Sequence, residues 1–189
     1  MKGIIFTQLV AMAEDSGGKE AVDRVIAASD LPTGGAYTSV GNYCCEEPFG
    51  LIGGLSEHSG LPAATLQRLF GHWLMHSFAR RSPSFFEARA GNLDTLEAIE
   101  DDIHAELRKA YPDAELPLAE TRRDGADDFD LIYCSPRPLA DFCHGLIDRR
   151  AAYFGEKACI ARGDASSDGQ TVATLRVETS PSPSPNPSP

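Results

Sequence analysis

The spacing of apolar residues changes once along this chain of 189 residues, and that change limits the folds available to it. Up to about residue 111, apolar residues recur every three or four positions, which is the spacing of amphipathic helices. From Leu116 onward they alternate, which is the spacing of strands with one buried face. Helices followed by strands with short turns favour an α+β fold with an antiparallel sheet.

The same pattern locates the individual elements. Helices are expected from about residue 4, from about residue 21, over 48–59 and 63–80, and from about 93 until Pro112 prevents continuation. Two strands around 116–118 and 129–133 are joined by the turn Asp124-Gly125. Pro138 can open a helix that runs to about 154. A hairpin then pairs 157–162 with 171–177, which completes a four-stranded sheet.

Charge and hydropathy exclude several partners. The chain has 28 acidic and 17 basic residues, a net charge of −11, and this charge repels phosphate backbones. Its apolar runs are too short to cross a bilayer, and its start is not a convincing signal peptide. We therefore expect a soluble cytoplasmic protein with no nucleic-acid or membrane partner.

The end of the chain has a different composition from the rest. Serine and proline alternate over residues 180–185 and 188–189, and nothing there can be buried. This composition predicts a solvated, polyproline-like tail over 179–189 and a folded domain over 1–178.

The clearest candidate site is the segment Tyr133-Cys134-Ser135-Pro136-Arg137. In a strand, positions 133, 135 and 137 share one face and the two residues between them point to the other. A phenol, a hydroxyl and a guanidinium on one face suit a buried carboxylate or phosphate. An ordinary strand end with exposed polar residues is the alternative.

His104 is the second candidate, because it lies at the margin of the apolar stripe of its predicted helix. A packed core histidine is the alternative interpretation. The combination is more informative than either part, since a helix with one inward histidine ends at Tyr111-Pro112 and the polar strand follows about thirty residues later.

With these motifs the chain resembles a known family, the haem nitric oxide/oxygen-binding (H-NOX) domains, which are related to the sensor domain of soluble guanylate cyclase. The similar segments are Met1-Lys2-Gly3-Ile4-Ile5-Phe6, Ile103-His104 with Tyr111-Pro112, the Tyr-x-Ser-x-Arg signature at 133–137, and Gly145-Leu146-Ile147.

The resemblance implies haem b (iron protoporphyrin IX) between a helical lobe and a sheet-containing lobe. It implies His104 as the axial ligand of the iron, and three residues that hold the propionates: Tyr133, Ser135 and Arg137. It further implies contacts with the macrocycle from Ile5, Phe78, Pro112 and Leu146, of which Ile5 and Pro112 press it out of plane. Each of these four is also a plausible plain core residue.

The resemblance also predicts the gas and the signal. Oxygen-binding relatives have a distal tyrosine five positions after the signature arginine, and this chain has Phe142 there. Phenylalanine donates no hydrogen bond, so we expect nitric oxide and carbon monoxide to bind ferrous haem and oxygen not to bind appreciably. Other donors remain available, namely Tyr37, Tyr43, Trp73 and Tyr153. Nitric oxide is expected to release His104 and let the helical lobe move against the sheet.

We expect a sensor and not an enzyme, with its effector in trans. By resemblance this effector is a histidine kinase, a cyclic-dinucleotide enzyme or a cyclase, and a fragment of a larger cyclase is the alternative. Two other classes stay open: a haem enzyme such as a peroxidase or dioxygenase, and a haem-free interaction module with the same fold.

Other possible metal ligands are less specific. His72 and His76 are four residues apart on one predicted helix, but no third ligand is obvious. The cysteines at positions 44, 45, 134, 143 and 159 fit reduced thiols better than a disulfide framework, and zinc binding or thiol sensing stays open.

Overall fold

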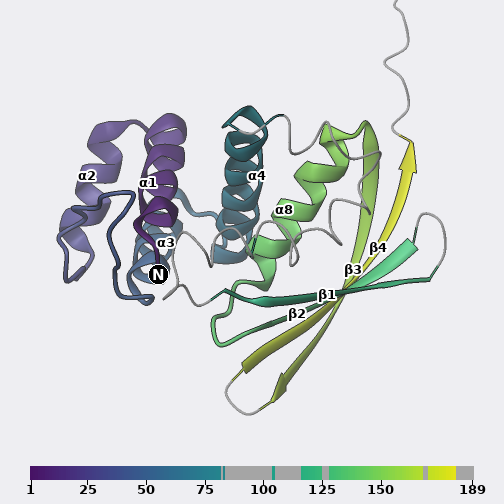
Figure 1. Ribbon diagram of the computed structural model, residues 1–189. Helices are drawn as coiled ribbons and strands as arrows, with labels where there is room; N and C mark the ends of the chain where they lie inside the picture. Colours follow the sequence, from purple (N-terminus) through teal and green to yellow (C-terminus); the bar gives the residue numbers. More distant parts are fainter. Residues whose placement is uncertain (82, 84–103, 105–115, 125–127, 168–169, 182–189) are drawn as a thin grey trace, which may run out of the picture.

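A computed structural model of the chain shows a helical part followed by a sheet that one helix covers (Figure 1). It describes residues 1–81, 83, 104, 116–124, 128–167 and 170–181. Within these residues the helices are α1 (Gly3–Gly17), α2 (Lys19–Ala28), α3 (Glu47–Ser59), α4 (Ala63–Arg81) and α8 (Ala140–Tyr153). The strands are β1 (Leu118–Arg123), β2 (Asp128–Ser135), β3 (Glu156–Ser167) and β4 (Gln170–Pro181). The α+β prediction is therefore confirmed.

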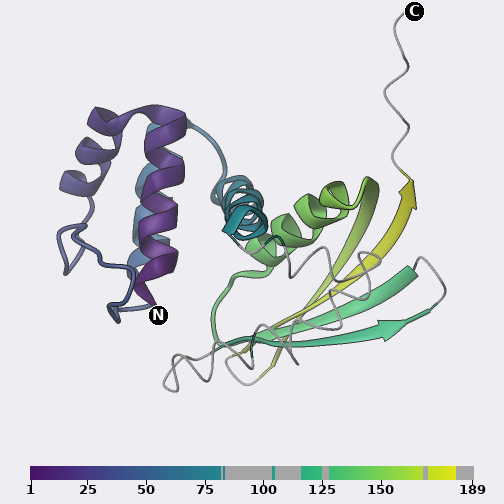
Figure 2. The same ribbon diagram turned by 45° about the horizontal axis from the view of Figure 1, so that its top comes forward.

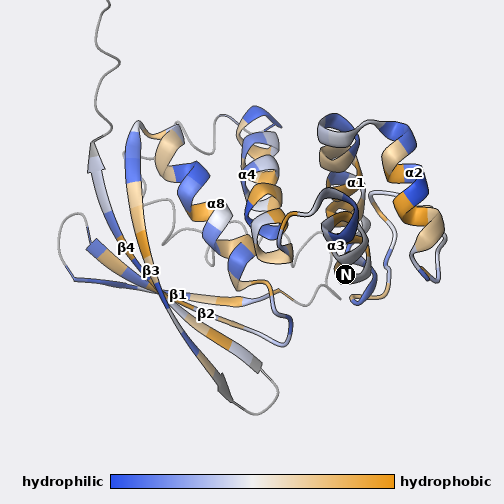
Figure 3. Cartoon of the chain, turned by 180° about the vertical axis from the view of Figure 1, so that it is seen from behind, coloured by the Kyte–Doolittle hydropathy of each residue, from blue (hydrophilic) through white to orange (hydrophobic). Residues whose placement is uncertain are grey.

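The sheet is antiparallel throughout, in the order β1-β2-β4-β3. Its two central strands are β2 and β4, and in β2 every second residue is buried because α8 covers one face of the sheet (Figure 2). Phe129, Leu131, Ile147, Leu175 and Val177 form the core between α8 and the sheet. Figure 3 shows the resulting mixture of apolar and polar residues along α8 and the strands.

The last hairpin is longer than its apolar pattern predicts. Residues 163–167 were expected in a turn, but they continue β3 and pair with β4. Backbone hydrogen bonds do not require apolar side chains, so polar residues can extend a hairpin that is already in register. The domain boundary expected after residue 178 falls inside β4, which runs to Pro181.

The helical part has its own core, formed by buried residues of α1 to α4: Leu9, Met12, Val25, Leu51, Ile52, Leu66 and Phe70. The start of α1 is fixed against the loop before α3, because Gly3 N donates to Gly41 O at 2.8 Å. A Cβ atom on Gly3 would lie 1.9 Å from the Thr38 carbonyl oxygen. The glycine of the opening motif therefore permits a close backbone contact and places the rest of α1.

Helices α4 and α8 contact each other through their backbones and join the two parts. A Cβ atom on Gly71 would lie 2.4 Å from Phe142 O, and one on Gly145 would lie 2.1 Å from Arg68 O. Two glycines thus allow an approach that larger residues would prevent. None of the described helices is long and apolar enough to span a bilayer.

Candidate functional site

The polar segment at the end of β2 is buried on one face, as its sequence predicts. Tyr133, Ser135 and Arg137 are buried, with 3%, 2% and 9% of their surface exposed. The residues between them, Cys134 and Pro136, are more exposed. The strand itself ends at Ser135, so Arg137 lies in the bend that follows and not in the strand as expected.

Hydrogen bonds hold this polar segment together. The Arg137 backbone N donates to Ser135 Oγ at 3.1 Å, which fixes the bend directly after β2. Burial raises the pKa of the Tyr133 phenol to about 12, while its hydrogen bond with Ser135 and the charge of Arg137 oppose that shift. The phenol therefore keeps its proton near neutral pH and remains a hydrogen-bond donor.

His104 is the other predicted ligand, and its side chain is also buried, with 9% of the residue exposed. Its neighbours over 84–103 and 105–115 lie outside the described residues, and Pro112 is among them. The predicted helix over 93–111 therefore cannot be compared with the structure, apart from the burial of His104.

The apolar residues of the predicted site come from three helices and share partial burial. Ile5 of α1 and Phe142 of α8 border the helical core, where the Phe142 ring lies 5.1 Å from that of Phe70. Phe78 of α4 and Leu146 of α8 pack together with Met75 and Ala79. The structure thus places residues of α1 and α8 at the border of one core, and brings α4 together with α8.

Four other residues are candidate hydrogen-bond donors to a bound gas, and their environments differ. Tyr37 donates to Glu47 Oε2 at 3.0 Å, and the Tyr43 hydroxyl accepts from Thr38 N at 2.7 Å. Tyr153 is 43% exposed. Trp73 borders the helical core, as Phe142 does, and its buried Nε1 has no hydrogen-bond partner among the described residues.

The two histidines of α4, His72 and His76, each contact a residue of α8 and do not point to a shared metal position. His72 Nε2 lies 2.9 Å from Asp148 Oδ2, and His76 Nδ1 lies 3.4 Å from an Arg149 nitrogen. No group of three or more candidate metal-binding side chains occurs within the part of the chain that the structure describes.

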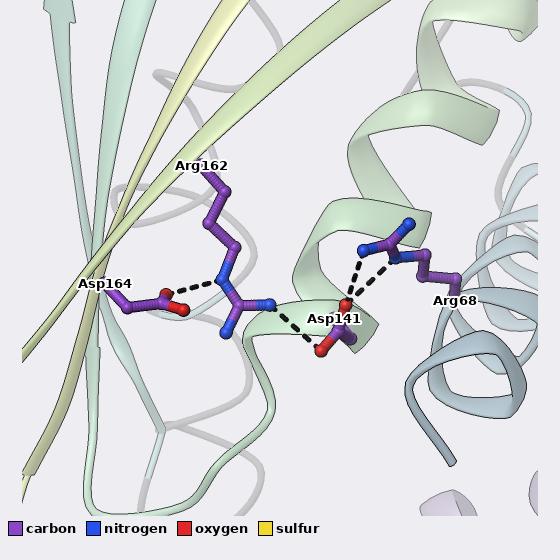
Figure 4. Close-up of polar contacts among 4 residues, drawn as sticks. All are labelled: Arg68, Asp141, Arg162 and Asp164. Atoms are coloured by element: carbon purple, nitrogen blue, oxygen red, sulfur yellow. Dashed lines mark hydrogen bonds and ion pairs between the residues drawn. The ribbon is translucent and has the colours of Figure 1, made fainter. Parts of the chain in front are cut away.

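Sequence reasoning missed an ionic cluster at the first turn of α8. Asp141 contacts two arginines, Arg68 of α4 and Arg162 of β3, and Arg162 also contacts Asp164 (Figure 4). These residues are separated by up to 96 positions, from 68 to 164, so no local pattern signals their contact.

Comparisons with known proteins agree with this arrangement. The family model for haem-NO-binding domains matches residues 2–162. A ferrous, unliganded H-NOX protein from K. algicida is 32% identical, with a TM-score of 0.88 over 95% of this chain and 97% of that one. A ferrous H-NOX variant from S. oneidensis is 24% identical, with a TM-score of 0.86 over 97% and 98% of the chains. No curated protein matches the chain significantly.

The fold and this site define a sensor domain of the haem-based class, with helices followed by an antiparallel sheet. The chain belongs to the haem-NO-binding family, whose members are the H-NOX domains. A further similar structure is an oxygen complex of an H-NOX domain related to soluble guanylate cyclases. It is 22% identical, with a TM-score of 0.80 over 95% of each chain, which shows a shared fold.

The residues present fit a haem. Its two carboxylates require buried cationic or hydroxyl donors, and Tyr133, Ser135 and Arg137 supply three of them in five positions. The macrocycle requires large apolar side chains that it can cover, and Ile5 and Phe142 are partly exposed at the border of the helical core.

Proposed function

We propose that this protein senses nitric oxide at ferrous haem b, with His104 as the axial ligand. The observation that carries the proposal is the buried donor set of Tyr133, Ser135 and Arg137 in a member of the haem-NO-binding family. A ferrous haem supplies an iron that takes diatomic gases on the side opposite its protein ligand.

The polar end of the site orients the cofactor through its carboxylates. Arg137 supplies a fixed positive charge, and its guanidinium can donate two parallel hydrogen bonds to one carboxylate. Ser135 accepts from the Arg137 backbone N and also hydrogen-bonds the Tyr133 phenol, so the two hydroxyls together leave one hydrogen for another acceptor. The Tyr133 phenol is neutral near neutral pH, as phenols are, and burial raises its pKa further, to about 12.

The apolar end forms the walls of the site. In the proposal Ile5, Phe78, Leu146 and Pro112 contact the macrocycle, and Phe142 borders the bound gas. The partial burial of Ile5, Phe78, Phe142 and Leu146 supports this assignment, because large apolar residues at a border favour an apolar ligand that covers them.

Gas selectivity follows from Phe142. Bound oxygen carries partial negative charge and needs a donor, whereas nitric oxide binds ferrous haem strongly without one. An air-equilibrated ferrous sample is therefore expected to show no stable oxygen complex, and Phe142→Tyr is expected to promote one. If the unaltered protein does form that complex, Phe142 does not determine selectivity, and Trp73→Phe will show whether the Trp73 indole N–H is the donor.

The signal is proposed to arise at His104. Nitric oxide binding releases this side chain, and the helices then move relative to the sheet, which changes the surface offered to a partner. The proposed partner is a histidine kinase, a cyclic-dinucleotide enzyme or a cyclase in trans, in the cytoplasm. A nitrosyl complex that retains its imidazole ligand would contradict this step.

The central experiment is substitution of the axial ligand. His104→Gly is expected to abolish the Soret band of the purified protein, and added imidazole is expected to restore it. His58→Gly is the matched control, because His58 is exposed near the end of α3 and should leave the spectrum unchanged. Equal Soret bands for His104→Gly and the unaltered chain would overturn the assignment of His104 and favour another ligand. Absence of haem from both proteins would favour the haem-free interaction module.

A further inference from the structure

We propose that Asp141 is a positioning residue for the gas-binding pocket, because it fixes the first turn of α8, which carries Phe142, to both α4 and β3. The proposal rests on the function proposed above, in which Phe142 borders the bound gas. It assigns a role to a side chain that does not itself line the pocket.

The two carboxylate oxygens of Asp141 bind different arginines (Figure 4). Arg68 of α4 places Nε and Nη2 each 2.9 Å from Asp141 Oδ1. Arg162 of β3 places Nη1 2.9 Å from Asp141 Oδ2. One acidic side chain therefore connects the helical part, α8 and the sheet.

The Asp141 side chain is less exposed to solvent than two other side chains of the cluster, Arg68 and Asp164. The Asp141 side chain is 18% exposed, whereas those of Arg68 and Asp164 are 48% and 58% exposed. Burial alone would raise the pKa of Asp141, but hydrogen bonds from Arg162 and Arg68 outweigh it and lower that pKa. Asp141 is therefore a carboxylate near neutral pH, and both contacts are present under ordinary conditions.

Close backbone contacts between α4 and α8 connect the position of Asp141 with that of Phe142. Gly145 lies four residues after Asp141, on the same face of α8, and approaches Arg68 O closely. Gly71 approaches the carbonyl oxygen of Phe142 itself. Since the turn that carries Phe142 lies between these contacts, a change in the Arg68–Asp141 contact moves Phe142 relative to Phe70, its ring neighbour.

A purely stabilising role accounts less well for the arrangement. The ion pair with Arg68, which is 48% exposed, contributes little to stability, because solvent screens it and ordering a long side chain is costly. The Arg162 side chain is less exposed, at 24%. A shared carboxylate between three elements does fix orientation, because each oxygen defines the direction of one arginine.

The matched control is Asp164, the second partner of Arg162. Asp164 Oδ1 lies 2.5 Å from Arg162 Nε, but within the part of the chain that the structure describes Asp164 has no hydrogen bond or ion pair with α4 or α8. Asp164→Asn and Asp141→Asn remove the same charge and each takes one partner from Arg162. Only Asp141→Asn also releases Arg68.

The experiment compares these two variants in the full chain with ferrous haem. For Asp141→Asn we expect a shifted or broadened C–O stretching band of the carbonyl complex and a carbon monoxide dissociation rate changed by about threefold or more. Asp164→Asn is expected to match the unaltered protein, and Asp141→Glu is expected to recover part of the difference. Identical bands and rates in both Asn variants would overturn the proposal.

Two further measurements separate the possible failures. If Asp141→Asn does not fold, Arg68→Gln replaces it, since that variant breaks only the α4 contact and should shift the same band. If the unaltered chain binds no haem, the proposed function fails, and hydrogen exchange of the amides of 140–146 becomes the readout. Exchange faster in Asp141→Asn than in Asp164→Asn would then support the positioning role, and equal exchange would reject it.

Discussion

The sheet and the helical part complete their cores in different ways. Between α8 and the sheet, Phe129, Leu131 and Leu175 are at most 2% exposed. The helical core is equally buried at its centre, but large side chains remain partly exposed at its border, among them Ile5, Trp73 and Phe142. The sheet core also has a partly buried border, but three of its four residues are small: Ala119, Cys143, Ala158 and Ile160. In the proposed function, the larger border residues of the helical core contact the ligand.

The two ends of the proposed site differ in a related way. The polar end occupies five consecutive residues at one strand end, whereas the apolar end combines residues of α1, α4 and α8. Substitutions at the polar end are therefore expected to affect only the residues next to them. Damage to the crossing of α4 and α8 is expected to affect several walls of the site together.

The largest expected effect lies in the sheet core. Phe129→Ala removes a ring that is 1% exposed and should lower the free energy of unfolding by about 3 to 5 kcal/mol. Phe142→Ala should cost less than half of that, because its ring is only partly buried, but it should alter the carbonyl spectrum. Urea denaturation and absorption spectra check both variants. Equal losses of stability would show that the two cores do not differ as described.

The helix crossing is the next test. Gly145→Ala places a Cβ atom against Arg68 O and should destabilise the protein by about 1 to 3 kcal/mol. In Gly53→Ala, a matched helical control, the new Cβ atom meets nothing within 4 Å, so a gain of about 0.5 to 1 kcal/mol is expected. Denaturation of both variants provides the comparison. A neutral Gly145→Ala would mean that the crossing is looser than the structure shows.

A smaller effect is expected at the polar end. Ser135→Ala removes the acceptor of the Arg137 backbone N and should cost about 1 kcal/mol, together with a faster loss of haem to apomyoglobin. Cys134→Ala, on the other face of the same strand, should leave haem loss unchanged. If both variants lose haem at the same rate, the Ser135 hydroxyl has no special role.

The smallest effect concerns pH. Because the pKa of Asp141 is lowered in the folded protein, its contribution to stability is present above the usual carboxyl pKa of about 4 and is lost as pH falls through the lower folded value. Unfolding free energies of the unaltered chain and Asp141→Asn should therefore differ by a constant amount from neutral pH to about pH 5 and converge in more acidic solution. A constant difference down to the lowest pH would contradict this assignment.

Local patterns in the sequence predicted much of the fold. The helices α1 to α4 and strand β2 lie close to where the apolar spacing placed them, because that spacing reflects which side of each element is buried. The first strand, expected around 116–118, is instead Leu118–Arg123, and the helix expected to open at Pro138 begins at Ala140. The shared face of Tyr133 and Ser135 was also predictable, since alternation along a strand is fixed by backbone geometry. The burial of Arg137 was not predicted by this rule, because Arg137 lies in the bend after the strand. The extra length of β3 was not predictable either, because backbone pairing continued where the side chains gave no signal.

The sequence by itself therefore determined the elements, the polar face at the end of β2 and, through its motifs, the family. Only the tertiary structure decided which residues meet across elements. Ile5 and Phe142 share the border of one core, and Asp141 joins Arg68 to Arg162, because α4 and α8 cross at Gly71 and Gly145. Periodicity specifies which face of a helix is buried, but the partner of that face depends on how whole helices pack.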